Sequence, residues 1–546
     1  MYSNLQSQTS SPSEFTRMSV NQATAPHPAI DLLHRIFEDP TLTIDQKKQL
    51  LEEIIKITRP EKTHSQFNIK EVEYSNSESS CNTSLKKVDY SLPEKNGIHG
   101  LRSIRHRIFS LYRRLFTLVI IVNLATLIGI MGSSRMRRLE YVATAVASNL
   151  TASVLFRQEH VVNLLFWIAC SVPVSAPLWI RRNCAKVYHI GGLHSGFAVA
   201  SLTWLLVFTV LATIQRASPA VLTLTYILDS VLVTICALAH PIFRVKYHDH
   251  FELTHRFAGW TALALFWAQT IVQVADTQKS TDRSLGYLLL RTPNVWLLAV
   301  ATGSTILPWA KLRKVTVKSE VLSSHAVRLH FDYTTPFPGT AVRISSRPLL
   351  EWHAFATISK PASPTPPAVP NEFTSTDGKG FSLVVSNAGD WTKRQITHPP
   401  TKLYARGIPT CAVLCIVPLF HSILLVATGS GIGPCLPILY RCAITRKLPP
   451  TSKRRHIPLR VFWSTPNPLQ TFGQEIHDAI LDADPQAVIH DTRTMGRPDM
   501  LAVSWGMRVE SGCEAVCVIS NKKVTQKVVY GMEARGVPGF GAIFDS

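Results

Sequence analysis

Cysteine pairs of the kind that bind zinc or form a disulfide framework are missing from this 546-residue chain. Its ten cysteines include no Cys-x-x-Cys motif and follow no regular spacing. Cys170 and Cys236 lie inside apolar runs, and Cys435 and Cys517 lie in a stretch that resembles a nucleotide-binding domain. Cysteine in such surroundings behaves as a small hydrophobe, so we expect buried reduced thiols without a metal-binding role.

The chain also lacks the features of two other protein classes. Its start, MYSNLQSQTSSPSEF, has no apolar segment, which argues against a secretory signal peptide. No zinc-finger spacing or RNA-binding aromatic signature accompanies the formal net charge of +21, so we expect no nucleic-acid partner. The Lys and Arg residues instead gather at the ends of apolar segments, as they do in membrane proteins.

A block of long apolar segments stands between more polar flanks. Six of these segments approach the roughly 20 residues needed to cross a bilayer. Their expected boundaries are 115–133, 161–180, 191–214, 221–245, 255–275 and 294–310. The shorter stretch 141–156 is interpreted as interfacial or re-entrant. The sequence therefore predicts a multi-pass α-helical bundle in a lipid bilayer.

Basic segments predict how this bundle is oriented. They precede the first span and follow the second, fourth and sixth, so they share one side if the N-terminus is cytosolic. Arg135, Arg137 and Arg138 fall on the opposite side and weaken this assignment without reversing it. Both termini are therefore expected in the cytosol.

The residue pattern on either side of the bundle differs from that of the apolar segments. Residues 1–28 are predicted to be disordered, and AIDLLHRIFEDPTLTIDQKKQLLEEIIKI to form a helical hairpin. After Trp309, alternating β-branched segments predict an antiparallel β-barrel. From His421, strands alternate with helices, as in a parallel sheet. The expected domains are a disordered and helical N-terminal region (1–100), a six-span transmembrane domain (101–310), a β-barrel (311–420) and an α/β nucleotide-binding domain (421–546).

The sharpest local signal is SILLVATGSGIGPCLPILY, in which an apolar strand leads through a glycine-rich turn into a helix. Glycines let the backbone approach a pyrophosphate at the helix N-terminus, and proline fits the first helical turn. The candidate binding residues of this turn are Gly429, Ser430, Gly431, Gly433 and Pro434. Glycine-rich turns also occur in α/β domains that bind no nucleotide.

Two further segments favour nucleotide binding. NAGDWT, at 387–392, follows a strand and offers backbone amides at a helix start, which suits a second phosphate. AVIHDTRTMGRPD offers Arg493 and Arg497 around a Gly-Arg-Pro turn, which suits an adenosine phosphate. Each segment alone is also compatible with a surface loop. Their order, after a barrel and across a parallel sheet, predicts two nucleotide sites.

Residues 311–546 resemble the ferredoxin-reductase-type FAD/NAD(P)H module of ferric reductases and NADPH oxidases, and with the six spans the resemblance covers 115–546. The segments VYHIGGLHSG, HRFAGW, GDWT, GSGIGP and GFGAIFDS are most similar to fungal integral membrane proteins of the TmpA type. This resemblance implies hydride transfer from NADPH or NADH to FAD, with a role in fungal secondary metabolism or development.

The resemblance also implies which residues bind FAD. The family's His-Pro-Phe-Ser/Thr segment corresponds to 353–356, where Ala354 and Ala356 replace the proline and the hydroxyl residue. Thr357 is the nearest substitute, although strand alternation points it to the other face. Ordinary packing is the alternative for His353 and Phe355. The implied FAD-binding residues are His353, Phe355, Thr357, Gly389, Asp390, Trp391, Thr392 and Phe544.

The resemblance also implies further NAD(P)H-binding residues besides those of the glycine-rich turn. They are Ser464, Thr465, Arg493, Gly496, Arg497, Pro498 and Ser520. Hydroxyl and guanidinium groups in this set favour NADPH over NADH, because a 2′-phosphate needs such partners. The family's terminal Cys-Gly-Pro turn is not intact, and Ser520 or Cys517 stands nearest to its position.

Histidines bear on whether the chain carries haem. The family uses two helices that each supply two histidines about fourteen residues apart. His194 and His255 each begin a predicted span, but the positions fourteen residues further hold Phe208 and Gln269. The outer haem site is therefore absent, and electrons are expected to stay on the cytosolic side. We favour the interpretation that His194 and His255 are interfacial histidines without a cofactor. A single inner haem held by these two histidines is the alternative.

Three functions remain open. The favoured one is a membrane-anchored NAD(P)H-dependent FAD oxidoreductase that reduces a small-molecule electron acceptor on the cytosolic side, with a membrane-bound or cytosolic pathway partner. The second is a haem-containing transmembrane ferric reductase or NADPH oxidase. The third is a non-catalytic membrane sensor or scaffold that retains the fold. Flavin and haem absorption distinguishes among them.

Overall fold

The computed structural model describes residues 91–542 except 99, 101, 103, 105–108, 132–138, 360–379 and 449–454. The expected N-terminal helical hairpin lies outside the described residues, as do Arg135, Arg137, Arg138 and Phe544.

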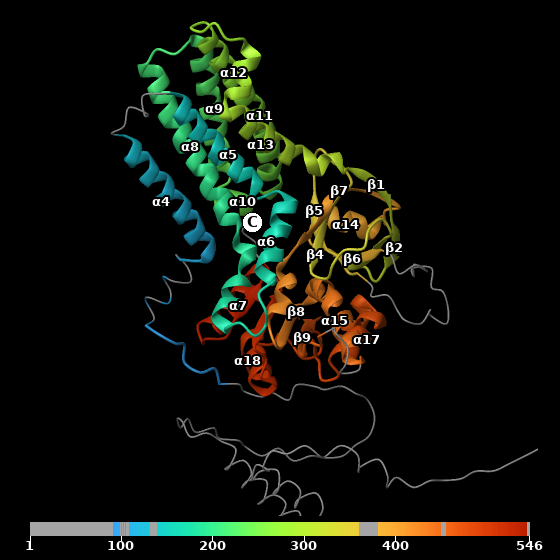
Figure 1. Cartoon of the computed structure of the whole chain (residues 1–546). Coiled ribbons are helices and arrows are strands. Elements are labelled where there is room, and N and C mark those ends of the chain that lie inside the picture. The colour runs from blue at the N-terminus through green and yellow to red at the C-terminus, as the bar shows by residue number, and fades with distance from the viewer. Residues whose placement is uncertain are drawn as a thin grey trace, which may run out of the picture. The chain divides into compact units, whose positions relative to one another are not determined.

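Six helices form a bundle (Figure 1). They are α4 (Leu111–Met131), α5 (Leu139–Leu155), α8 (Gly191–Ile214), α9 (Pro219–Leu238), α11 (His248–Gln278) and α13 (Pro293–Ala310). Phe208, Leu228, Phe266 and Leu298 are among the fully or nearly fully buried side chains of their shared core. The short helices α10 (Pro241–Lys246) and α12 (Leu285–Arg291) connect members of the bundle.

The number of membrane crossings differs from the expectation. Among the described residues, α4, α8, α9 and α11 are long and apolar enough to cross a membrane. A fifth crossing is counted only if α5 and the following helix α6 (Glu159–Cys170), bent by 70°, form one broken span. Six spans are therefore not confirmed. The four helices indicate membrane association, while multi-pass insertion and cytosolic termini stay predictions.

The predicted second span, 161–180, is not one continuous helix. Helix α6 ends at Cys170, and a turn containing two prolines leads to α7 (Leu178–Cys184) and η2 (Val187–His189). The stretch 141–156, predicted to be interfacial or re-entrant, lies instead in α5, which packs in the bundle against α8 and α13. The bundle thus contains α5 where a 161–180 helix was expected.

Antiparallel strands follow the bundle, as predicted. One sheet has the order β1-β7-β4-β5 and the other β2-β3-β6. The strands are β1 (Arg313–Thr316), β2 (Lys318–Val321), β3 (Ala326–Phe331), β4 (Thr340–Ser345), β5 (His353–Ala356), β6 (Phe381–Ser386) and β7 (Lys402–Cys411). Both sheets contribute to one apolar core, together with helix α14 (Asp390–Thr397). A single closed barrel is not confirmed, because the strands form two sheets.

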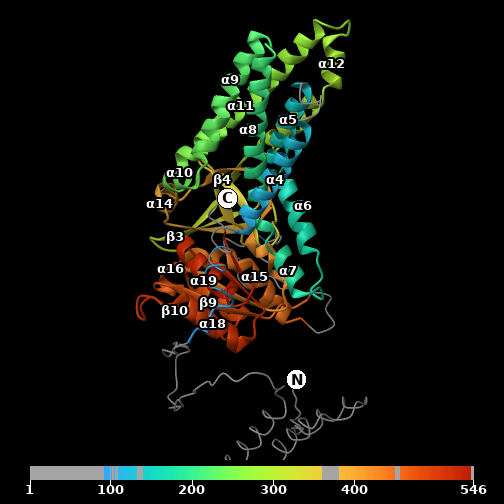
Figure 2. The same ribbon diagram turned by 90° about the vertical axis from the view of Figure 1, so that its left-hand side faces the viewer.

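The last part of the chain forms the predicted parallel sheet, with the order β10-β9-β8-β11-β12. Its strands are β8 (Ile423–Thr428), β9 (Leu459–Thr465), β10 (Val488–Asp491), β11 (Ala515–Ile519) and β12 (Gly539–Gly541). The other elements of this region are η3 (Val413–Leu419), η4 (Gly429–Gly431), α15 (Ile432–Arg446), α16 (Pro468–Phe472), α17 (Gln474–Ala483), α18 (Met500–Ser511) and α19 (Lys522–Glu533). Helices α15 and α17 contribute to one apolar cluster and α18 and α19 to another. Figure 2 labels α15, α18 and α19 in the same part of the molecule as strand β9 of this sheet.

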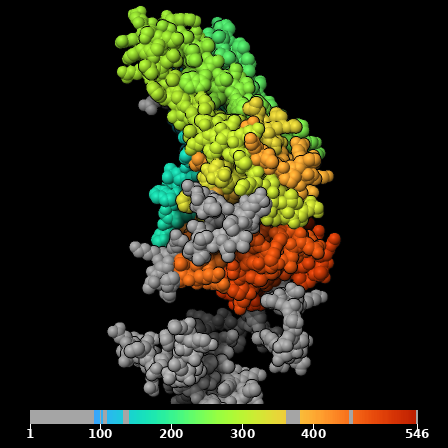
Figure 3. Space-filling model, turned by 90° about the vertical axis from the view of Figure 1, so that its right-hand side faces the viewer, coloured from blue at the N-terminus to red at the C-terminus, as the bar shows by residue number. Residues whose placement is uncertain are grey.

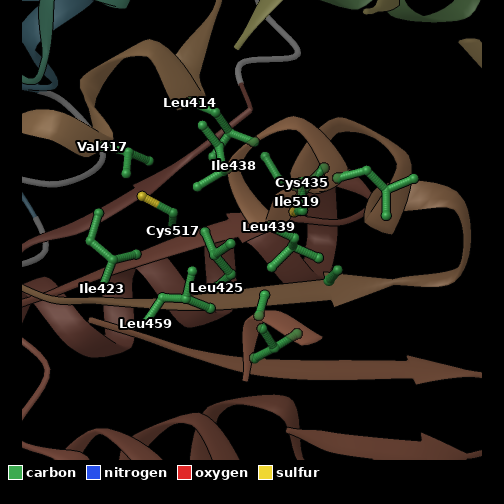
Figure 4. Packing of buried hydrophobic residues seen from close by; sticks show 14 of the residues in the cluster. Leu414, Val417, Ile423, Leu425, Cys435, Ile438, Leu439, Leu459, Cys517 and Ile519 are labelled. Atoms are coloured by element: carbon green, nitrogen blue, oxygen red, sulfur yellow. The ribbon is translucent and has the colours of Figure 1, made fainter. Parts of the chain in front are cut away.

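Figure 4 shows side chains of the first of these clusters. Leu425 of β8 and Cys517 of β11 pack with Cys435 and Leu439 of α15, and all four side chains are fully buried. Strands enclosed in this way read as continuous apolar runs, which explains why their sequences show little alternation.

The α6–α7 segment joins the bundle to the two sheet regions through polar contacts. The Glu159 carboxylate accepts a hydrogen bond from Arg343 Nη1 at 2.6 Å and from the N–H of Ile408 at 2.8 Å. Arg181 makes a two-pronged ion pair with Glu514, with both distances 2.7 Å. These polar contacts attach α6 and α7 to both sheet regions.

Candidate nucleotide-binding sites

The glycine-rich turn lies at the carboxyl end of β8, as predicted. A Cβ on Gly431 would overlap the carbonyl oxygen of Ile519 and lie 3.0 Å from its carbonyl carbon. Only glycine therefore lets the turn lie this close to the end of β11. Trp463 Nε1 donates to the carbonyl of Gly429 at 2.9 Å and holds the other side of the turn. Ser430 and Pro434 belong to the same turn and the first turn of α15.

The strand order places this turn at a switch point of the sheet. From β8 the chain continues to β9 and β10 on one side, and then crosses to β11 and β12 on the other. Open parallel sheets bind ligands in the crevice at the carboxyl ends of strands at such a point. The Thr428 and Ser520 hydroxyls meet there at 2.5 Å.

Ser520 and Cys517 differ in their access to this crevice. Cys517 is fully buried, and burial raises the pKa of its thiol to about 12, so it is neutral and enclosed. Ser520 follows the last residue of β11 and is only partly buried. The structure therefore leaves Ser520 as the candidate nearest a nicotinamide ring.

The predicted adenosine side of the site lies at the ends of β9 and β10. Ser464 and Thr465 end β9 and are both buried, and the Thr465 hydroxyl has no hydrogen-bond partner among the described residues. Asp491 Oδ1 accepts from the N–H of Arg493 at 2.8 Å and of Asn467 at 2.9 Å, which connects the two strand ends.

The Gly-Arg-Pro turn follows in the same loop. Gly496 has a φ of 72°, which favours glycine, and its carbonyl lies 2.8 Å from His490 Nε2. Arg493 and Arg497 are exposed, and Pro498 is half-buried. Two exposed guanidinium groups near the carboxyl edge of the sheet suit a phosphate, so these residues remain candidates.

The NAGDWT segment forms the start of α14, directly after β6. Thr392 Oγ1 accepts from the N–H groups of Ala388 and Gly389, each at 2.9 Å, and donates to the Gly389 carbonyl at 2.8 Å. Apart from Gly389 itself and its two chain neighbours, no described residue has an atom within 4 Å of a Cβ built on Gly389, and Asp390 is exposed. The open, ordered start of this helix fits a phosphate group of FAD.

The other predicted flavin residues pack with one another. The His353 and Trp391 rings stack with centroids 4.1 Å apart, and the Phe355 ring lies 5.8 Å from that of Trp391. Trp391 is buried and donates to Ser346 Oγ at 3.1 Å. The structure thus brings the HAFA and GDWT segments together, with Trp391 as a packing residue of the strand region.

Thr357 is placed differently from its companions. It is fully buried, and its hydroxyl is bonded to Thr340, 2.9 Å from Thr340 Oγ1 and 3.1 Å from the carbonyl. Strand alternation had pointed it to the face opposite Ala356, the position that it would replace. Its assignment to FAD stays a prediction, but its hydroxyl already has partners.

The two candidate sites lie on adjoining elements. A Cβ on Gly433, in the first turn of α15, would lie 3.3 Å from Cβ of Val384 in β6. Strand β6 leads directly into the NAGDWT segment. The turn predicted for NAD(P)H therefore abuts the strand that precedes the segment predicted for FAD.

The histidines considered as haem ligands are neighbours. The His194 and His255 rings have centroids 6.2 Å apart, and His194 Nδ1 lies 2.9 Å from the Ser153 carbonyl oxygen. Within the described part of the chain, no group of three or more His, Cys, Asp or Glu side chains could hold a metal ion. The haem alternative thus rests on two histidines alone.

Sequence reasoning missed a cluster where the bundle meets the first sheet. The guanidinium of Arg406, in β7, lies over the rings of Trp309 and Trp352, 4.7 and 4.4 Å from their centroids. The only sequence signal was an arginine inside a strand-like segment, LYARGIP, which ordinarily indicates an exposed face.

The chain is similar to fungal proteins named as reductases. A family model described as adenylate-forming reductase 03009, C-terminal domain, matches residues 413–546. The chain is 45% identical over 493 residues to adenylate-forming reductase 03009 of Coprinopsis cinerea, covering 87% of this chain and 45% of that protein. It is 44% identical over 483 residues to adenylate-forming reductase 06235 of the same fungus, covering 86% and 44%. The chain thus spans less than half the length of these curated relatives.

Solved structures give weaker likenesses. Ferredoxin-NADP+ reductase from Plasmodium falciparum with 2'P-AMP has a TM-score of 0.31 and 12% identity, covering 42% of this chain and 94% of that one. The ferredoxin reductase in carbazole 1,9a-dioxygenase has a TM-score of 0.31 and 13% identity, covering 43% and 70%. Such scores do not establish a shared fold. The resemblance to TmpA-type proteins, ferric reductases and NADPH oxidases stays a prediction.

Proposed function

We propose that this chain is a membrane-anchored oxidoreductase that takes hydride from NADPH or NADH onto FAD and reduces a small molecule on the cytosolic side. The main support for this proposal is the close contact of Gly431 with the end of β11, at the switch point of the parallel sheet. A backbone this close, with a helix starting beside it, suits a dinucleotide pyrophosphate. The reductase names of the relatives agree with this proposal.

Each part of the site has a role in this proposal. The turn from Gly429 to Gly433 holds the pyrophosphate of NAD(P)H, and Arg493 and Arg497 hold its adenosine phosphate. The start of α14, ordered by Thr392, holds a phosphate of FAD. FAD supplies the capacity to accept two electrons from a nicotinamide and to pass them on. The chain itself binds and orients the reactants and shields them from water.

In the proposed flavin site, the side chain of His353 is a neutral imidazole. Burial lowers its pKa, although the nearby carboxylates of Glu351, Glu252 and Asp249 act in the opposite direction. Its ring is held against Trp391. We infer that it orients the flavin segment and contributes no positive charge there at neutral pH.

The test is the absorption spectrum of the full chain, purified in detergent, before and after NADPH is added under argon. We expect bound flavin and its bleaching by NADPH. The matched control is the Arg493→Ala variant, which should keep the flavin and bleach more slowly with NADPH. Flavin that NADPH does not bleach would favour the non-catalytic scaffold. A Soret band equal to two haems per chain would favour the ferric reductase or NADPH oxidase alternative.

The names of the relatives support a second candidate, in which the reduced compound is an adenylate. NADPH consumption that requires an adenylated compound would favour this candidate. NADPH consumption with other acceptors alone would contradict it.

A further inference from the structure

An apolar groove of about 400 Å³ lies between α11 and α13. Trp260, Trp267 and Trp309 line it, together with aliphatic and threonine side chains of both helices. Trp267 Nε1 donates to Thr302 Oγ1 at 2.9 Å, so this indole leaves no free donor in the groove. Pockets that bind small molecules typically have volumes of roughly 300–1,000 Å³ and mostly apolar linings.

The groove opens where a membrane-dissolved molecule can enter it. Helix α11 is one of the helices long and apolar enough to cross a membrane. Ala264, which lines the groove from α11, and Ile306, which lines it from α13, are both exposed. Figure 3 shows a face on which the yellow-green helices of the bundle adjoin the yellow and orange strand segments. An apolar ligand can therefore reach the groove from the bilayer.

An aromatic series leads from the groove to the candidate flavin segment. The Trp260 and Trp309 rings meet edge to face with centroids 5.4 Å apart, and Trp309 and Trp352 meet similarly at 6.0 Å. Trp352 immediately precedes His353 in the chain. Planar rings pack well in such edge-to-face surroundings. The series thus connects the groove, which Trp309 lines, to Trp352, the residue before His353 in the segment proposed for FAD.

A cation with an unused donor packs on Trp309, one of the residues that line the groove. Arg406 lies over Trp309 and Trp352, and its buried Nε has no hydrogen-bond partner among the described residues. Burial, with Arg343 and Arg256 nearby, lowers the pKa of Arg406 to about 9, so it remains charged at neutral pH. A buried donor without an acceptor is costly, and an oxygen acceptor would remove that cost.

We propose that this groove binds a membrane-dissolved quinone, with its ring among the tryptophans and a carbonyl oxygen toward Arg406, and that this quinone is the electron acceptor. The inference rests on the proposed function and names its substrate class. A lipid acyl chain would fill the apolar walls but would leave the Arg406 donor unsatisfied. A quinone supplies both the planar ring and the acceptor oxygen.

The reaction balances without a further reactant. NAD(P)H, one proton and the quinone give NAD(P)+ and the hydroquinone. The C4–H bond of the nicotinamide breaks and its electron pair reduces the quinone. Two O–H bonds form on the former carbonyl oxygens, one proton coming from the hydride equivalent and one from solvent.

The experiment uses the full chain in phosphatidylcholine nanodiscs, with decylubiquinone as the membrane-dissolved acceptor and ferricyanide as the water-soluble one. Ala264→Trp fills the groove from α11. Ile271→Trp adds the same bulk at an exposed position of α11 that does not line the groove, and serves as the matched control. We expect Ala264→Trp to raise the KM for decylubiquinone at least about tenfold and to leave ferricyanide reduction unchanged. Ile271→Trp should change neither.

A binding measurement without NAD(P)H separates this inference from the proposed function. Decylubiquinone should raise the Tm of the unreduced protein, because a ligand stabilises the state that it binds. Arg406→Gln should abolish this rise. If the unmodified chain reduces ferricyanide but neither binds nor reduces decylubiquinone, the groove inference fails and the proposed function stands. If it binds decylubiquinone but NADPH reduces neither acceptor, the proposed function fails. A Tm rise that persists in Arg406→Gln would identify a lipid-type occupant and overturn the quinone.

Discussion

The contact between the glycine-rich turn and β11 can be tested by substituting Gly431 with alanine. The added Cβ would overlap the Ile519 carbonyl oxygen and lie 3.0 Å from its carbonyl carbon and 3.3 Å from its Cγ2. The blocking atoms belong mainly to backbone, and Ile519 is paired with Ala427 of β8, so β11 cannot yield alone. The turn must therefore move away by about 1 Å, and overpacking of this kind costs about 1–3 kcal/mol.

This displacement should weaken nucleotide binding more than folding. The backbone amides of the turn are proposed to face the pyrophosphate, and each 1.4 kcal/mol lost is a tenfold loss of affinity. We therefore expect a Kd for NADP+ raised about ten- to 100-fold. Isothermal titration calorimetry on the purified full chain measures this, and a Tm determination by differential scanning fluorimetry shows how much of the cost falls on folding.

Gly433→Ala is the comparison for Gly431→Ala, because Gly433 belongs to the same proposed binding turn but its Cβ would meet no backbone atom of another element. Its Cβ would meet only the side chain of Val384, at 3.3 Å, which can shift by a few tenths of an ångström. We expect its Kd for NADP+ to change by no more than about threefold, which corresponds to less than 1 kcal/mol. Equal losses in the two variants, or unchanged binding in Gly431→Ala, would refute the reasoning.

Three further predictions concern other parts of the chain. Arg493→Ala should raise the KM for NADPH about tenfold and leave that for NADH unchanged, in steady-state assays with ferricyanide; equal effects on both would remove Arg493 from the 2′-phosphate. Thr392→Ala should lower the Tm by the equivalent of about 1 kcal/mol and increase loss of FAD on gel filtration, whereas full retention of FAD would contradict a phosphate at this helix start. Burial alone would raise the pKa of Glu514, but hydrogen bonds from Arg181 and the N–H of His421 outweigh it and hold the pKa below the usual 4.5. This ion pair therefore stabilises the fold above that pH and is lost as pH falls through the lowered pKa, so Glu514→Gln should reduce the Tm at pH 7 and flatten its fall below pH 4.5.

The sequence predicted most of the second half of the chain because its signals there are local. The strand, turn and helix of 422–440 appear as β8, η4 and α15. The change from antiparallel to parallel strands near residue 421 is also confirmed. Each depends on side chains within a few residues of one another, which a single sequence contains.

The helices were harder to predict because hydropathy does not distinguish lipid from protein surroundings. Phe166 of α6 is buried in the same apolar cluster as the parallel sheet. Helix α5 contains polar residues that are paired inside the bundle, such as Asn149 with Asn123 at 2.9 Å and Thr151 with the Leu297 carbonyl at 3.0 Å. The stretch 141–156 was interpreted as interfacial or re-entrant because it is short, and the sequence does not reveal these contacts inside the bundle.

The candidate sites were predictable as segments but not as contacts. The stacking of His353 on Trp391 joins strand β5 to helix α14, and the approach of Gly433 to Val384 joins two sheet regions. The Trp309–Arg406 contact joins a bundle helix to a strand nearly a hundred residues later. Such pairings are set by the tertiary fold, which spacing in one sequence does not reveal.

The attachment of α6 and α7 determines where this protein can be cut for biochemical work. A soluble fragment that begins at residue 311 would lose Glu159, which bonds the N–H of Ile408, and Asn163, which bonds that of Cys411. It would also remove Phe166 from the apolar cluster of the parallel sheet. Glu514 would lose its ion pair with the guanidinium of Arg181. A soluble fragment should therefore include residues 157–186 together with the nucleotide-binding half. A designed linker would join the two segments in place of the remaining helices.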